Sequence, residues 1–104
     1  MSERPKDEQA DQDSSSSINV KIGDAELKGA YSNLLRITHT REEFILDFIN
    51  VVPPQGIVSA RIVTSPGHLK RIIRALGTNL RRYEDVHGVI EEAPDPTDLS
   101  GRVN

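Results

Sequence analysis

The heptapeptide Ser65-Pro66-Gly67-His68-Leu69-Lys70-Arg71 marks the start of a long amphipathic helix that directly follows three strand-like runs. Ser65 is a favourable N-cap residue, and Pro66 suits the first helical position because its missing N–H would have no intrahelical partner there. Gly88 suits the position just after a helix end. These signals predict one helix of about twenty residues between Ser65 and Gly88.

Three runs before this helix alternate in side-chain character with a period of two, which is typical of half-buried strands. They occupy residues 31–39, 44–49 and 58–63. A shorter run from Ile18 to Ile22 is compatible with a fourth, edge strand that turns at Gly23-Asp24. The sequence leaves this fourth strand open.

The expected register follows from keeping apolar side chains on one face, because a slip of one residue would send them all to the other. A hairpin closed around residues 40–43 pairs Ile37 with Leu46. A second hairpin, closed around residues 52–56, pairs Leu46 with Ile62 and places Val58 on the same face. Pro53-Pro54 belongs in this second loop, because proline cannot donate to a strand ladder.

The fold class predicted from these patterns is α+β: a three- or four-stranded antiparallel meander followed by one long C-terminal helix packed on one sheet face. The helix offers an apolar stripe at steps of three and four residues, formed by Leu69, Ile72, Ile73, Leu76, Leu80, Tyr83 and Val86. We expect the most buried residues to include Leu46, Phe48, Ile62, Leu76 and Leu80.

The chain of 104 residues has room for one domain, which we place at residues 18–92. Residues 1–17 are acidic and almost free of aliphatic side chains, so we expect a disordered tail; residues 93–104 are expected to form a flexible C-terminal tail. The expected domain carries 10 Lys and Arg against 9 Asp and Glu, a balance that gives no general attraction to nucleic acid or to an anionic membrane. With no secretory signal and no long apolar run, a cytoplasmic location is the default.

Several short motifs occur together between residues 18 and 90: Tyr31-x-Asn33, Glu43-Phe44-x-Leu46-Asp47-Phe48, Pro53-Pro54, Arg61, Ser65-Pro66-x-His68-x-Lys70-Arg71, Asn79-x-x-x-Tyr83-Glu84 and Gly88-x-Ile90. In their joint spacing they resemble a widespread prokaryotic family of small domains of unknown function. The resemblance implies no activity, substrate or catalytic residue, and both tails lie outside it. A sheet backed by one long helix also has a loose similarity to the bacterial export chaperone fold, which is a similarity of fold alone.

The sheet face away from the helix is the first candidate site. In the expected register a carboxylate lies between two guanidinium groups and is flanked by aliphatic side chains, which favours a sheet-on-sheet interface between two copies of the chain. The alternative is an exposed ion pair of little energetic consequence. The candidate interface consists of Leu34, Arg36, Ile45, Asp47, Ile49, Arg61 and Val63.

The polar side of the helix is the second candidate site. Its basic side chains could contact phosphates, although a solvated helix face is the simpler interpretation. This basic face consists of Lys70, Arg71, Arg74, Arg81 and Arg82.

Catalytic, metal and cofactor sites are not expected. His68 and His87 lie at opposite ends of the helix, and His39 ends a strand on the expected core side. The chain has no cysteine, phosphate-binding glycine loop or nucleophile motif. We therefore expect a non-enzymatic, homo-oligomeric protein-interaction module, an adaptor or chaperone-like subunit, whose partners are itself and another protein. The alternative is a nucleic-acid-associated regulator that uses the basic face.

Overall fold

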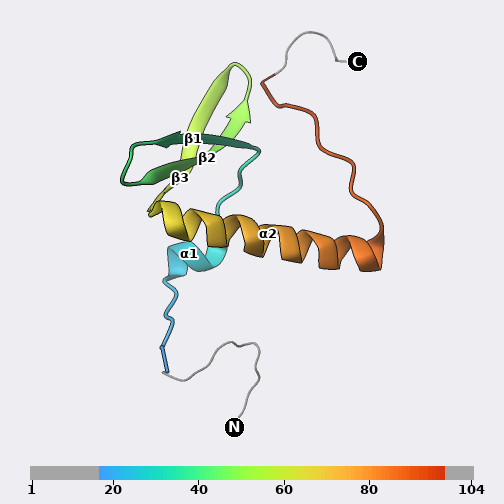
Figure 1. Cartoon of the computed structure of the whole chain (residues 1–104). Coiled ribbons are helices and arrows are strands. Elements are labelled where there is room, and N and C mark those ends of the chain that lie inside the picture. Colours follow the sequence, from blue (N-terminus) through green and yellow to red (C-terminus); the bar gives the residue numbers. More distant parts are fainter. Residues whose placement is uncertain (1–16, 98–104) are drawn as a thin grey trace.

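A computed structural model describes residues 17–97 of the chain (Figure 1). It contains three antiparallel strands followed by one long helix, which confirms the predicted α+β class. The expected tails fall largely on residues 1–16 and 98–104, which lie outside the described residues. The elements in chain order are α1 (Asp24–Lys28), β1 (Leu34–His39), β2 (Phe44–Val52), β3 (Gln55–Thr64) and α2 (Pro66–His87).

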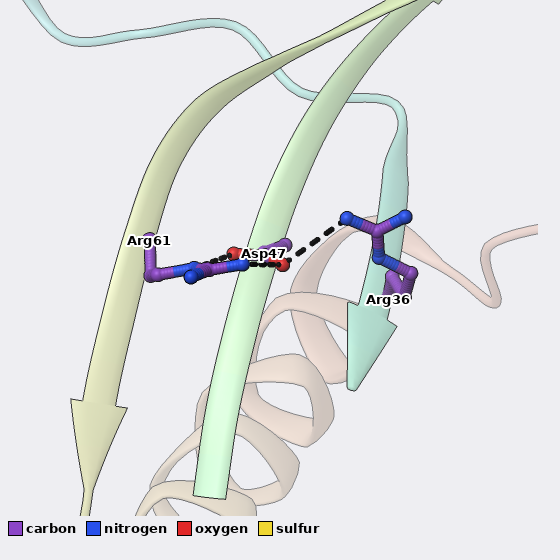
Figure 2. A network of polar contacts seen from close by, with 3 residues as sticks. All are labelled: Arg36, Asp47 and Arg61. Carbon is purple, nitrogen blue, oxygen red and sulfur yellow. Dashed lines mark hydrogen bonds and ion pairs between the residues drawn. The ribbon is translucent and has the colours of Figure 1, made fainter. Parts of the chain in front are cut away.

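The sheet has the order β1-β2-β3, and both neighbouring pairs are antiparallel. Ile37 pairs with Leu46 and Leu46 pairs with Ile62, so both predicted registers are confirmed. The face that carries these three residues is called the inner face below. Figures 1 and 2 place α2 on the side of this face.

The second hairpin is tighter than predicted and contains a bulge. β2 continues to Val52 and β3 begins at Gln55, which leaves Pro53-Pro54 as the turn. The register shifts between Phe48 and Ile49, which pair with Ala60 and Val58. Ser59 is the extra residue of β3, because it has no partner in β2. The residues of β3 that precede Ser59 therefore lie on the face opposite to the one that simple alternation predicts. The prediction that Val58 shares the inner face was therefore wrong: it lies across from Ile49 on the outer face.

The N-terminal segment does not form the fourth strand that the sequence left open. Residues 17–23 have no regular secondary structure, and the chain enters α1 at Asp24 instead of reversing at Gly23-Asp24. Ile18, Val20 and Ile22 are 79%, 89% and 61% exposed. β1 and β3 therefore remain the two edges of the sheet in this protomer.

The start of β1 is held by the side chain of Asn33. Its amide nitrogen donates to the Val51 carbonyl oxygen at 3.0 Å, and its carbonyl oxygen accepts from the Val51 N–H at 2.8 Å. The backbone N–H of Asn33 donates to the Ile49 carbonyl oxygen. The side chain thus satisfies both backbone groups of Val51 just beyond the β1–β2 ladder.

The helix α2 has the predicted bounds. The Ser65 hydroxyl accepts from the His68 N–H at 3.1 Å, which is the expected N-cap bond. Gly88 follows the last turn with φ 93°, and its N–H donates to the Glu84 carbonyl oxygen. The Glu84 carboxylate also accepts from the Ile90 N–H at 2.9 Å, so one side chain holds the chain after the helix.

The core of the single protomer is much smaller than predicted. Among the described residues, the buried hydrophobic side chains are Leu46 and Ile49, and α2 has none. Leu46 is confirmed and Phe48 is half-buried, but Ile62, Leu76 and Leu80 are 47%, 66% and 49% exposed. The predicted packing of the helix on the sheet is therefore not achieved, although α2 lies on the inner side.

The joint between β3 and α2 gives a physical reason for this difference. Ser65 is the one residue between Thr64 and Pro66, whereas strand-to-helix connections usually contain two to six residues. Because Ser65 is also the N-cap, it cannot supply the extra length that would let the helix turn back and lie closely on the sheet. Figure 1 shows α2 starting at the end of β3 and extending beyond the sheet.

Candidate functional site

Arg36, Asp47 and Arg61 form one cross-strand row on the outer face of the sheet (Figure 2). Arg61 donates from Nε to Asp47 Oδ1 at 2.7 Å and from Nη2 to Oδ2 at 2.9 Å. Arg36 donates from Nη2 to Oδ2 at 3.3 Å. The predicted row is therefore present, with a two-point contact on one side and a single, longer contact on the other.

The electrostatics of this row differ between its centre and its ends. The Asp47 side chain is 2% exposed, whereas those of both arginines are 58% exposed. Hydrogen bonds from Arg61 lower the pKa of Asp47 most strongly; burial opposes this, and Arg36 adds to it. In return, Asp47 raises the pKa of Arg61. The row has a net charge of +1, and its exposed part consists of guanidinium groups.

Two apolar rows flank the charged row. Leu34, Ile49 and Val58 lie across the three strands on one side of it. Ile45 and Val63 lie on the other side, next to Thr38 of β1. The structure therefore brings together all the residues of the candidate interface. Ile49 is buried, Leu34 and Ile45 are half-buried, and Val63 is 54% exposed.

A groove on the outer face extends from the charged row towards the β2–β3 turn. Its walls include Leu34, Arg36, Ile49, Val51, Val58 and Thr97. Thr97 comes from the segment after α2, which returns to the tip of the β2–β3 hairpin (Figure 1). Sequence reasoning missed Val51, Val58 and Thr97, because the bulge and the returning segment leave no periodic signal.

The basic face of α2 is exposed along its length. Lys70, Arg71, Arg74, Arg81 and Arg82 are all exposed, and Arg71 Nη2 lies 2.8 Å from His68 Nδ1. Asp85 follows Arg81 by four residues and so shares this side of the helix. A role of this face in binding nucleic acid stays a prediction.

The histidines lie apart from one another. His39 contacts the ring of Phe44 at 5.0 Å between centroids, and His87 contacts Tyr83 at 4.6 Å. Within residues 17–97, no three histidine or acidic side chains gather closely enough to hold a metal ion. No helix in the same part of the chain has the length and apolar character needed to cross a bilayer.

The family model described as protein of unknown function (DUF3467) matches residues 1–92. The chain belongs to the DUF3467 family. The predicted resemblance to a family of small domains of unknown function is thereby confirmed. The DUF3467 match begins at residue 1, however, so the prediction that the N-terminal stretch lies outside the family was wrong. No curated protein and no solved structure matches the chain.

The structure gives several residues of the quoted motifs a physical role in this DUF3467 chain. Asn33 joins β1 to β2, Asp47 and Arg61 form the central ion pair, and Ser65 and Glu84 cap the two ends of α2. These contacts position the outer face and the long helix. These contacts give the motif residues structural roles, and they indicate no chemical reaction for any of them.

Proposed function

We propose that the protein is a non-catalytic, homo-oligomeric protein-interaction module that works as an adaptor or chaperone-like subunit. The observation that carries the proposal is the apolar surface on the inner side of the protomer. This inner surface comprises six side chains that are 45–66% exposed: Leu35, Ile37, Ile62, Ile73, Leu76 and Leu80.

A group of exposed apolar side chains of this kind favours a polypeptide partner. Single exposed aliphatic residues are normal in proteins, whereas large groups of them mark interaction sites. The inner surface combines a sheet face with a helix stripe, so it is a broad surface rather than an enclosed pocket. A protein surface fits this shape better than a small ligand does.

The outer face offers a second surface with a different character. Its groove has a mixed lining that is more apolar than polar, and it reaches the charged row at Arg36. Because Asp47 is buried and the two arginine side chains are 58% exposed, the row presents positive charge outward. We propose that this face binds an extended partner segment that places an acidic side chain between apolar ones.

This division revises the expectation that the outer face mediates self-association. Ile49 is already buried and Leu34 is half-buried within the single protomer, which leaves Val58 and Val63, at 44% and 54% exposure, as the large exposed apolar side chains among the residues of this face, against six on the inner surface. The inner surface offers more. Self-association is therefore assigned to the inner side and partner binding to the outer side.

The test of partner binding uses two fluorescent seven-residue peptides of alternating valine and threonine, one with a central glutamate and one with a central lysine. We expect the glutamate peptide to bind the full chain at least about tenfold more tightly by fluorescence anisotropy. Arg36→Glu should abolish the preference, and Val58→Ser, which removes an apolar contact of the groove, should weaken the binding of both peptides. Arg74→Glu on the basic face is the matched control and should leave it unchanged.

Two results would contradict this function. Equal binding of both peptides, or none at hundreds of micromolar, would remove the outer face as an acidic-segment site. Salt-sensitive binding of a duplex oligonucleotide that Arg74→Glu abolishes, without peptide binding, would support the nucleic-acid alternative instead.

A further inference from the structure

We infer that a second copy of this chain covers the inner surface, so that the sheets and α2 helices of two protomers share one core. The inference rests on the self-association in the proposed function and deepens it by naming the surface.

Exposure changes along the apolar stripe of α2. Leu69 and Ile72 in the first two turns are half-buried. Ile73, Leu76 and Tyr83 further along are 60%, 66% and 51% exposed. The helix therefore offers its central and C-terminal turns as apolar surface, although each of its ends is capped and well formed.

The protomer cannot close this surface by folding back on itself. Ser65 is both the one-residue joint and the N-cap, so α2 begins directly after β3, with no further loop residues through which it could turn back onto the sheet. At the other end, Glu84 holds the chain as it leaves the helix, through the N–H groups of Gly88 and Ile90. The short joint at Ser65 keeps α2 in its present direction, and Glu84 fixes the exit of the chain from the helix, which leaves another chain to cover the stripe.

The charges favour a copy of the same surface as the occupant. The six side chains of the inner surface are all uncharged, and the basic side chains of α2 lie on the opposite side of the helix. Two copies related by a twofold axis would therefore bring apolar side chains together without opposing like charges. Their basic faces would remain in water.

The area is sufficient for a stable dimer. Burying one aliphatic side chain removes about 60–120 Å² of apolar surface from water. The six residues, together with Ile57 and Tyr83 at 69% and 51% exposure on the same side, offer roughly 400 Å² per copy on this basis. Since about 60% of an interface is apolar, two copies would bury about 1,300 Å² in all. Stable interfaces bury about 1,200–2,000 Å².

Sedimentation equilibrium of the full chain tests the inference with four proteins at 1–100 µM. We expect the wild-type chain of 11.5 kDa to sediment as a dimer at tens of micromolar. Leu76→Lys should weaken the dimer at least about thirtyfold, because it brings two like charges into an apolar contact. The matched control Ala75→Lys changes an exposed neighbour that lies about 100° around the helix from Leu76, at the border of the stripe, and should sediment like the wild type. Val63→Lys on the outer face should also remain a dimer.

A second measurement covers the case in which Leu76→Lys fails to fold. The chain has no cysteine, so Leu76→Cys and Ala75→Cys each introduce one unique thiol. At 100 µM the thiol at position 76 should be alkylated about tenfold more slowly than at 1 µM, because the second copy covers it at the higher concentration. The thiol at position 75 should react at the same rate at both concentrations.

The possible failures can be told apart. A wild-type chain that stays monomeric at 100 µM would overturn both this inference and the proposed self-association. A wild-type dimer that survives Leu76→Lys but dissociates in Val63→Lys would overturn the inference alone and move the contact to the outer face. Equal alkylation of position 76 at both concentrations would also overturn the inference. A monomeric wild type or equal alkylation does not bear on the peptide binding proposed for the outer face, whereas a dimer contact on the outer face would compete with that binding.

Discussion

Arg61 holds Asp47 through two hydrogen bonds of 2.7 and 2.9 Å, one to each carboxylate oxygen, across the central and last strands of the sheet. Arg36 contacts the same carboxylate from the first strand through one longer bond of 3.3 Å. The two arginines are equally exposed, so the difference lies in geometry. A planar guanidinium can satisfy both oxygens of a carboxylate at once, which a lysine ammonium cannot do in the same way.

The first prediction compares the two arginines by replacement with lysine. Arg61→Lys loses the two-point contact and should lower the melting temperature by roughly five degrees or more. Arg36→Lys gives up one long bond and should remain within about two degrees of the wild type. Thermal unfolding followed by circular dichroism measures both. A larger loss for Arg36→Lys would reverse the order of importance inferred from the geometry.

The second prediction concerns acid. Because the pKa of Asp47 is lowered in the folded chain from its ordinary value of 3.8, the unfolded chain binds more protons between the two values. The stability that Asp47 contributes is therefore fully present above about pH 4 and is lost as the pH falls through the lowered pKa. Asp47→Asn should melt well below the wild type at pH 7.

The difference between the two proteins should then shrink as the pH falls from 4 towards 2, because the wild-type carboxyl loses its charge as well. Urea midpoints at several pH values measure this gap. The other carboxyl groups titrate in both proteins and cancel in the comparison. A gap that is constant with pH would show that the Asp47→Asn substitution destabilises through the shape of the amide and that the ion pair contributes nothing.

The third prediction concerns Asn33, whose side chain pairs with both backbone groups of Val51. Asn33→Ala leaves these part-buried groups without their partner and should cost about 1–3 kcal/mol of the free energy of unfolding. Asn33→Asp keeps the acceptor for the Val51 N–H but cannot donate to its carbonyl oxygen, so it should also destabilise. Urea unfolding gives both values. Asn19→Ala, at an exposed position outside the elements, is the control and should change little.

These residues show which parts of the molecule the sequence could predict. Alternation in residues 31–63 and the matching of apolar faces gave the strands and both registers, because a slip would expose every core side chain. The capping signals Ser65 and Gly88 gave the helix bounds, since local hydrogen bonds set them. The row of Arg36, Asp47 and Arg61 followed from the register alone.

The remaining features depend on non-local geometry. No periodic pattern in the sequence marks the bulge at Phe48, so Val58 was predicted on the wrong face. The exposure of Leu76 follows from the one-residue joint at Ser65 rather than from the stripe. Amphipathic periodicity shows that a face will be covered, but it does not show by which chain. The groove wall at Thr97 depends on how the segment after α2 returns to the sheet.

The fourth prediction concerns Gly77 in the middle of α2. A Cβ atom added there would meet nothing within 4 Å, apart from the helix's own nearby backbone. The usual penalty of a glycine within a helix is therefore not offset by a close contact in the protomer. Gly77→Ala should stabilise the chain by about 1 kcal/mol in urea unfolding. A destabilised variant would place the backbone of another chain against this turn of the helix.

The fifth prediction links folding to association. If the second copy supplies most of the core, then the free energy of unfolding includes the free energy of association, and the melting temperature must rise with protein concentration. The reason lies in the small core of the protomer, in which Leu46 and Ile49 are the buried hydrophobic residues described. Scans of the wild type from 2 to 200 µM should shift upward by several degrees over the two decades. Ala75→Lys should follow the same slope, whereas Leu76→Lys should melt lower and without dependence on concentration. A wild-type melting temperature that does not change with concentration would mean that the protomer is stable alone with its inner surface exposed. The inner surface would then bind a different protein.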